Sequence, residues 1–400
     1  MTEAIVTPKK RILAIDIMRG LTLFLMLFVN DLYESGVPSW LVHSKANVDG
    51  MGLADWVFPG FLFMVGLSIP YAVAARERKG DNRIKILGHI LVRTISLLLI
   101  GVLMMNIGRL NAELSGINRN IWAILIYVSI FLVWNKYPES DKLKWLPVTL
   151  KAIGIIGIVS LVSIFRAGEP GHVEWLTTGW WGILGLIGWG YFTSVIVYLL
   201  CRSRLWYIVA AWLFFVTLNI LSQLGLTNFL NFAKPVFGVI IGGNVPSIVI
   251  AGLLIGVILK QSSASVERKI TIFGAIGIAT FASGFILRNW FIISKIYGTP
   301  SWAMVCNGIS ILVFAFLLFL VDHKEKYKWA GVFRIAGQNS LTTYLAPDIL
   351  YFSFWALAWP VFFYKQDTSQ LLAVIGSAVW ALAMIGFANL LSRLNIRLKL

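Results

Sequence analysis

The chain has 400 residues, of which 58% are hydrophobic and only 13% are charged, whereas soluble domains carry about 25% charged residues. This composition excludes an ordinary soluble domain and predicts an all-α, polytopic membrane helix bundle. The net charge of +16 does not indicate nucleic acid as a partner, because the basic residues fall between apolar runs and form no single patch.

Apolar runs long enough to cross a bilayer recur along the chain, since a bilayer core of about 30 Å requires about 20 such residues. We predict about 11 to 12 transmembrane helices, near residues 12–30, 52–75, 85–107, 118–134, 147–165, 179–200, 206–223, 244–260, 270–287, 302–321, 336–359 and 370–391. No internal repeat or long linker separates them, so we expect a single transmembrane domain over 1–400. Cys201 and Cys306 show no Cys-x-x-Cys spacing, and we expect neither a disulfide nor a metal site.

Lysine and arginine concentrate in alternate connections between the spans, as they do on the cytoplasmic side of membrane proteins. This set of connections begins with "PKKR" at 8–11 and holds 23 of the 34 basic residues, whereas the opposite set holds eight. Both termini are therefore predicted to be cytoplasmic, in a multi-pass protein of the plasma (inner) membrane surrounded by lipid. The sequence leaves the oligomeric state open, with a homodimer as one option.

Three polar residues of the first span fall on one narrow stripe. Asp16, Arg19 and Asn30 lie within about 60° of one another on a helix, and Asp16 and Asn30 are about 21 Å apart along its axis. One interpretation is an ion pair of Asp16 with Arg19 near the interface, with Asn30 ending the span. The other is a polar wall that crosses the bilayer. Arg93 lies in the third span. Its side chain either reaches back to the membrane surface or holds an anion in the cytoplasmic half of the bundle.

The loop between the first two spans contains His43. A lone histidine in a loop is usually solvated or a helix cap, but an imidazole also acts as a base or nucleophile at neutral pH. The second span opens with "ADWVFP", in which Asp55 suits an N-cap and Pro59 suits the first helical turn. His172, in "EPGHVEW" on the same predicted side of the membrane, is the alternative base.

These segments occur in an order that resembles a known family. The succession of "IDIMRG", "LFVN", a loop with a histidine and "ADWVFPGFLFMVGLS" resembles the catalytic domain of heparan-α-glucosaminide N-acetyltransferase and its bacterial relatives, a branch of the transmembrane acyltransferases. The resemblance is sharpest over residues 11–71, and "GWWGILGLIGW" and "GQNSLTTYL" are fainter matches. This chain departs from the family after the histidine, where the family often shows Trp-Asn-Gly and this chain reads "HSKANVDGMG".

The resemblance implies that cytoplasmic acetyl-CoA donates an acetyl group to an amino sugar or another saccharide on the far side of the membrane. It implies that His43 is the active-site histidine. An imidazole there would act as general base or as nucleophile, and Asp49 or Asp55 would orient its ring, as a carboxylate does in a catalytic triad. The amide of Asn30 would polarise the thioester carbonyl.

The donor site is expected in the cytoplasmic half of the bundle. CoA carries several phosphate charges, so Arg19 and Arg93 are the expected phosphate ligands, with Asp16 beside them. The strongest alternative function is a secondary transporter of a small anionic or sugar solute, because many spans and intramembrane charges are also typical of transporters. Such proteins are usually built from structural repeats, and the two halves of this sequence do not match.

Overall fold

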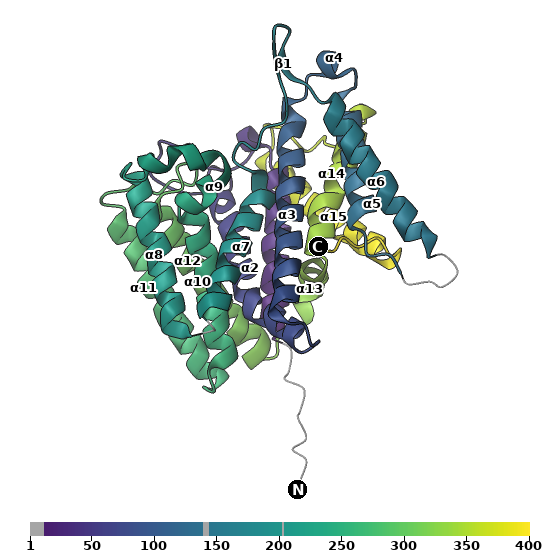
Figure 1. Ribbon diagram of the computed structural model, residues 1–400. Helices are drawn as coiled ribbons and strands as arrows, with labels where there is room; N and C mark the ends of the chain where they lie inside the picture. The colour runs from purple at the N-terminus through teal and green to yellow at the C-terminus, as the bar shows by residue number, and fades with distance from the viewer. Residues whose placement is uncertain (1–11, 139–143, 202–203) are drawn as a thin grey trace.

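The computed structural model describes residues 12–138, 144–201 and 204–400, and it shows one bundle of long helices (Figure 1). The long helices are α1 (Leu13–Asp31), α2 (Leu53–Glu77), α3 (Arg83–Asn106), α5 (Arg119–Trp134), α6 (Trp145–Ile164), α7 (Gly182–Cys201), α8 (Leu205–Gln223), α10 (Asn244–Gln261), α11 (Val266–Leu287), α12 (Pro300–Leu317), α14 (Ser340–Ala356) and α15 (Gln370–Arg393). Shorter helical segments are α4 (Ala112–Ser115), α9 (Lys234–Ile241), α13 (Gly331–Gln338), the 3₁₀ turns η1 (Glu34–Gly36), η2 (Ile107–Arg109), η4 (Asn228–Ala233) and η6 (Lys328–Ala330), and the π-helical turn η5 (Leu318–His323). An antiparallel hairpin pairs β1 (Ala167–Glu169) with β2 (His172–Glu174).

Apart from the span at 336–359, each predicted span coincides with one of these long helices, and their ends agree to within a few residues. Within the described chain, ten helices are long and apolar enough to cross a membrane. The two that are shorter, α5 and α14, have 16 and 17 residues. The predicted all-α, polytopic membrane bundle is therefore confirmed. The basic segment predicted to be cytoplasmic at 8–11 lies outside the described residues.

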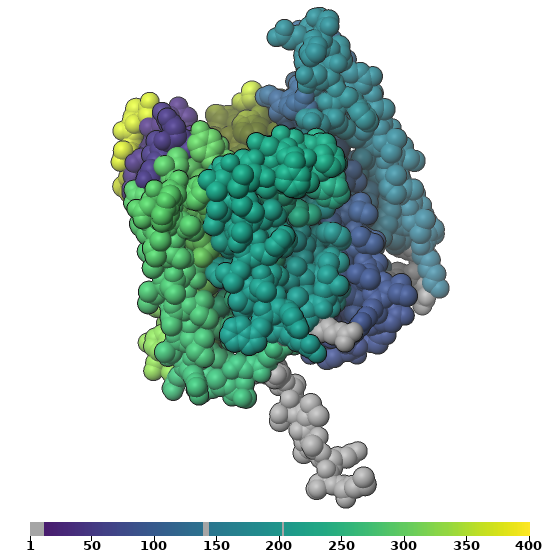
Figure 2. Space-filling model, turned by 60° about the vertical axis from the view of Figure 1, so that its left-hand side comes forward, coloured from purple at the N-terminus to yellow at the C-terminus, as the bar shows by residue number. Residues whose placement is uncertain are grey.

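The centre of the bundle is the contact between α2 and α10, where small residues let the two backbones approach closely. A Cβ atom at Gly66 would lie 1.8 Å from the carbonyl oxygen of Val249, and one at Gly252 would lie 1.9 Å from that of Phe63. Helices α6, α8 and α11 are only 17%, 17% and 22% buried, as expected of helices that face lipid. Figure 2 shows α6 along one edge of the molecule, with the hairpin at its end.

The predicted span at 336–359 is interrupted in the structure, and this part of the prediction is wrong. The interruption falls at Asn339, whose φ of −122° and ψ of 39° separate α13 from α14. Just before it, Gly337 lies where α13 packs directly on α1. A Cβ atom at Gly337 would lie 2.2 Å from the Asp16 carbonyl oxygen. The polar "GQNS" segment thus ends a short helix that supports α1.

The first turn of α1 is capped by a residue from a distant part of the chain. Asp322, in η5, accepts hydrogen bonds from the backbone N–H groups of Leu13 at 3.0 Å and Ala14 at 2.9 Å. Amides in the first turn have no partner within their own helix, and a carboxylate also interacts favourably with the positive end of the helix dipole. The position of α1 is therefore fixed by α13 along its side and by η5 at its start.

Candidate active site

His43 and Asp55 form a hydrogen-bonded pair at the start of α2. The Nδ1 atom of His43 lies 2.8 Å from Oδ1 of Asp55, whose side chain is only 1% exposed. The other carboxylate oxygen, Oδ2, accepts hydrogen bonds from the backbone N–H groups of Ser44 at 3.0 Å and Gly52 at 2.9 Å. Asp55 therefore orients the imidazole and also holds the residue that follows His43 and the last residue of the loop.

The second span begins close to its predicted start at residue 52, but the interpretation of Asp55 as its N-cap is wrong. Gly52 is the N-cap and α2 begins at Leu53, so Asp55 is the third residue of the helix and accepts a bond from the N-cap N–H. Pro59 consequently lies beyond the first turn, inside the helix. The capping role expected of Asp55 is thus met from a different position, and the same side chain still reaches His43.

Asp49, the other carboxylate considered as a partner of His43, has a different role. It accepts hydrogen bonds from Nε of Arg288 at 2.7 Å and from the backbone N–H of Ile293 at 2.8 Å. The Ile293 N–H and the Arg288 guanidinium hold the pKa of the Asp49 carboxyl below its usual range. Asp49 thereby fastens the His43 loop to the segment that follows α11.

That segment brings Lys295 to the imidazole. Its Nζ atom lies 3.1 Å from Nδ1 and 3.3 Å from Nε2 of His43, and 3.4 Å from the carbonyl oxygen of Ala54. Nearly equal distances to the two ring nitrogens place the amine beside both of them and not in line with either one alone. Burial lowers the pKa of the Lys295 amine, and the negative charge of Asp55 partly opposes this effect.

A cavity of about 250 Å³, which we call the His43 cavity, opens beside this pair. It is lined by Met26, Val29, Asn30, His43, Ala54, Val57, Phe58, Trp180, Ile183, Leu186 and Lys295. Asn30 and Trp180 supply polar groups next to His43. The backbone on both sides of Trp180 is unusual, since Gly179 and Trp181 have φ values of 47° and 71°. A positive φ is costly for tryptophan, and such strain is found most often at functional sites.

Asn30 is held in place through its neighbour Asp31. The fully buried Asp31 carboxylate accepts hydrogen bonds from the hydroxyl groups of Tyr351 and Tyr364 and pairs with Lys365 at 2.8 Å. These contacts tie the end of α1 to α14 and to the segment that follows it. Adjacent residues are about 100° apart around a helix, so with Asp31 anchored in this way the neighbouring Asn30 lines the His43 cavity.

A second cavity, of about 390 Å³, brings together the two arginines predicted to bind the donor. We call it the arginine cavity. Nη2 of Arg19 donates a hydrogen bond to Oγ of Ser68, and the guanidinium of Arg93 lies 4.6 Å from the centre of the Tyr191 ring. The Nε atom of Arg93 is buried and has no hydrogen-bond partner among the described residues. Arg93 is thus available to an anion in this cavity.

A third cavity, of about 760 Å³, continues from the arginine cavity, because Arg19, Ser68 and Ala72 line both. We call it the basic cavity. Its charged lining residues are Asp16, Arg19, Arg78, Lys260, Lys269 and Asp322. The predicted ion pair is present, with Asp16 and Arg19 3.9 Å apart, and both residues line this cavity. Cations outnumber carboxylates on its walls, which suits an anionic ligand.

A family model described as a domain of unknown function, DUF5009, matches residues 11–233, which is more than half of the chain. The chain belongs to this family. The matched DUF5009 region contains His43, Asp55 and both arginines of the arginine cavity, whereas Lys295 lies beyond its end.

Two curated relatives of this DUF5009 member carry the name heparan-alpha-glucosaminide N-acetyltransferase. The mouse protein is 33% identical over 143 residues, which cover 34% of this chain and 21% of that protein. The human protein is 35% identical over 96 residues, which cover 24% of this chain and 14% of that protein. The matched segments thus span less than a quarter of the length of either relative.

The structure separates the predicted residues into two groups and adds others. His43 and Asn30 meet at one cavity, with Asp55 behind the imidazole, and Arg19 and Arg93 meet at another. His172 is placed apart from them: its side chain is 87% exposed on the hairpin, where it pairs with Glu174. The residues that sequence reasoning missed include Ser68, Tyr191, Trp180 and Lys295. A lysine in a predicted non-cytoplasmic connection was the available signal for Lys295, but nothing in the sequence linked it to His43.

Proposed function

We propose that this protein is a membrane acetyltransferase that moves an acetyl group from cytoplasmic acetyl-CoA to an amino sugar or another saccharide at the non-cytoplasmic end of the bundle. The observation that carries the proposal is the His43–Asp55 pair, which opens on a cavity in line with two cavities lined by cations. The similarity to relatives named as N-acetyltransferases supports the reaction type. The bias of basic residues toward alternate connections supports the sidedness.

The basic and arginine cavities suit the donor. The phosphate groups of CoA would be bound by Arg78, Lys260 and Lys269 in the basic cavity, and by Arg19 or Arg93 farther into the bundle. Ser68 fixes the Arg19 guanidinium, and the Tyr191 ring supports that of Arg93. Preorganised cations lose little side-chain freedom when an anion binds, which favours binding.

The His43 cavity suits the chemical step. A hydrogen bond donated by Nδ1 of His43 to Asp55 leaves Nε2 as the base that accepts a proton from the acceptor amine or hydroxyl. The carbon–nitrogen or carbon–oxygen bond to the acceptor then forms as the thioester carbon–sulfur bond breaks, and the thiolate of CoA takes up a proton. Lys295 and Asn30 line the space where the carbonyl oxygen becomes negative, and positioned donors of this kind stabilise such an oxyanion.

The test is the release of CoA by the purified protein with acetyl-CoA and glucosamine. We expect free thiol to appear only when both substrates are present, and His43→Ala to lower the rate by about 100- to 10,000-fold while CoA still binds. His172→Ala is the matched control and should keep the parental rate. A stable His43→Ala protein with parental activity would disprove the role of His43. A secondary transporter, in contrast, would consume no acetyl-CoA.

A further inference from the structure

The three cavities follow one another along α1 and α2. On α1, Asp16 and Arg19 line the basic cavity, and the arginine cavity is lined by Arg19, Leu23 and Met26. Residues 26–30 line the His43 cavity. On α2 the order is reversed, from residues 68–78 through 61–72 to 54–58. Because both helices give the same succession, the three cavities lie one after another through the bundle.

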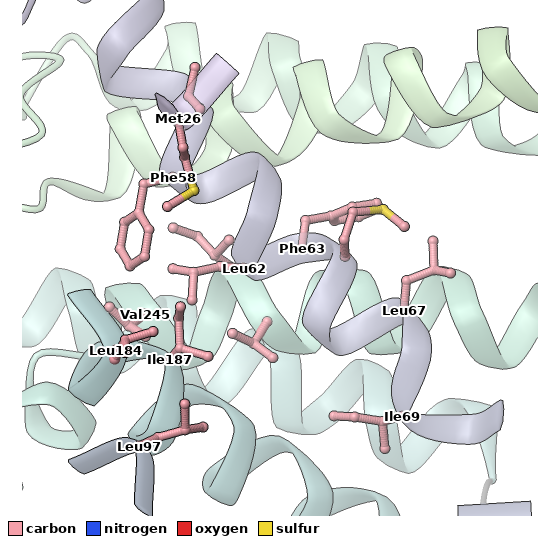
Figure 3. Close-up of a cluster of buried hydrophobic side chains, with 14 of the residues drawn as sticks. Met26, Phe58, Leu62, Phe63, Leu67, Ile69, Leu97, Leu184, Ile187 and Val245 are labelled. Carbon is pink, nitrogen blue, oxygen red and sulfur yellow. The ribbon is translucent and has the colours of Figure 1, made fainter. Parts of the chain in front are cut away.

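The arginine and His43 cavities are separated by a thin partition. Met26 lines both cavities. On α2, Phe58 lines the His43 cavity and Phe61 lines the arginine cavity, and three residues of helix correspond to about 4.5 Å. The partition is therefore less than one helical turn thick. Figure 3 shows the Met26 side chain reaching from α1 toward Phe58, close to Leu62.

Among the side chains at this partition, Met26 is the one best suited to move. It is 3% exposed, so it fills the space in the structure. Methionine is unbranched and has three rotatable bonds, so it adopts different shapes at low cost. Phe58 and Leu62 belong to the same buried cluster as Met26, but an aromatic ring and a branched side chain have fewer ways to rearrange than the unbranched methionine. A change of Met26 rotamer would join the two cavities without moving a helix.

We propose that the Met26 side chain is the movable partition between the donor and acceptor halves of this row of cavities, and that it limits the length of acyl chain that can be transferred. This inference rests on the proposed function, because it assumes that the acyl end of the donor passes from the arginine cavity to His43. A short acetyl group passes when Met26 turns aside. A longer acyl chain needs the volume that the methionine side chain occupies.

Two substitutions test the inference in opposite directions. Met26→Phe should keep CoA affinity within about threefold, because the cations that bind the phosphates are unchanged, and should lower acetyl transfer on the order of 100-fold through misplacement of the thioester. Met26→Ala should raise the rate with butyryl-CoA relative to acetyl-CoA about tenfold or more, as expected when a hydrophobic pocket gains room for methylene groups. Leu25→Phe is the matched control. Leu25 is the preceding residue of α1 and is not among the described residues that line either cavity.

The outcomes separate this inference from the proposed function. Parental transfer rates and parental acyl preference in both Met26 variants would overturn the inference and leave the acetyltransferase proposal standing. If Met26→Phe does not fold, the acyl preference of Met26→Ala decides alone. If the parent binds CoA but transfers to no sugar, the acetyltransferase proposal fails. In that case binding still decides whether Met26 limits the length of the acyl chain. Met26→Ala should then raise the affinity for butyryl-CoA relative to the affinity for CoA.

Discussion

Replacing Asp55 with asparagine should invert the hydrogen bonding of His43. In the parent, Oδ2 accepts two backbone N–H groups, from Ser44 and Gly52, and Oδ1 faces Nδ1 of His43. The single amide oxygen of Asn will remain on the side of the two N–H donors, because an NH₂ group there would face two other donors. The NH₂ group must then point to Nδ1 of His43, and the imidazole proton moves to Nε2.

In that tautomer, Nε2 no longer has a lone pair to accept a proton from the acceptor. We therefore expect Asp55→Asn to lower the rate of CoA release by about 100- to 10,000-fold, the range for loss of general base assistance. Weaker bonds to two backbone amides should also cost about 1–3 kcal/mol of stability, which thermal unfolding would measure. CoA binding should remain, because the cations of the donor cavities are unchanged.

Asp49→Asn is the matched control for this prediction. Asp49 also fastens the His43 loop, through Arg288 and Ile293, but it does not contact the imidazole in the described structure. It should keep the rate within about threefold, as is typical of substitutions away from the reacting groups. If Asp49→Asn and Asp55→Asn lower the rate of CoA release equally, anchoring of the His43 loop alone explains the loss of rate. A folded Asp55→Asn protein with the parental rate would refute the proposed orientation of His43.

Three further predictions concern the donor site, the loop and the topology. Arg19→Gln and Arg93→Gln should each raise the dissociation constant for CoA about ten- to a hundredfold, since a hydrogen bond to a charged group contributes about 1.5–3 kcal/mol; calorimetry that finds parental affinity in both would place the donor elsewhere. The lowered pKa of Asp49 means that its contribution to stability is present above the ordinary value of 3.8 and is lost as pH falls through the lower folded value. The free energy of unfolding of Asp49→Asn, measured against pH, should therefore fall less steeply in acid than that of the parent. The same pH dependence in both proteins would contradict this role of Asp49. A cysteine at Lys79 should be protected from an impermeant reagent in intact cells, and labelling there would reverse the proposed orientation.

Local sequence patterns predicted those features of the protein that depend on neighbouring residues. Apolar length indicated the spans, and Asp55 was an available partner for His43 because only a short loop separates them. Lys295 and Trp180 reach the same cavity from distant parts of the chain, and their positions depend on how the helices pack. The break at Asn339 was also missed, because the apolar residues on either side of the polar "GQNS" segment were joined into one span, whereas the contact of Gly337 with α1 depends on packing between distant helices.

The cap of α1 has a consequence for the order of assembly. Leu13 and Ala14 are among the first residues of the bundle to be synthesised, yet their amides bind a carboxylate that lies 309 and 308 residues later. We expect those amides to remain in contact with water, and the amino end of α1 to stay at the membrane surface, until η5 has been synthesised. Asp322 also lines the basic cavity. The same late event therefore completes the start of the first helix and the wall of the proposed donor site, and we expect a nascent chain that stops before η5 to be inserted in the membrane but unable to bind CoA.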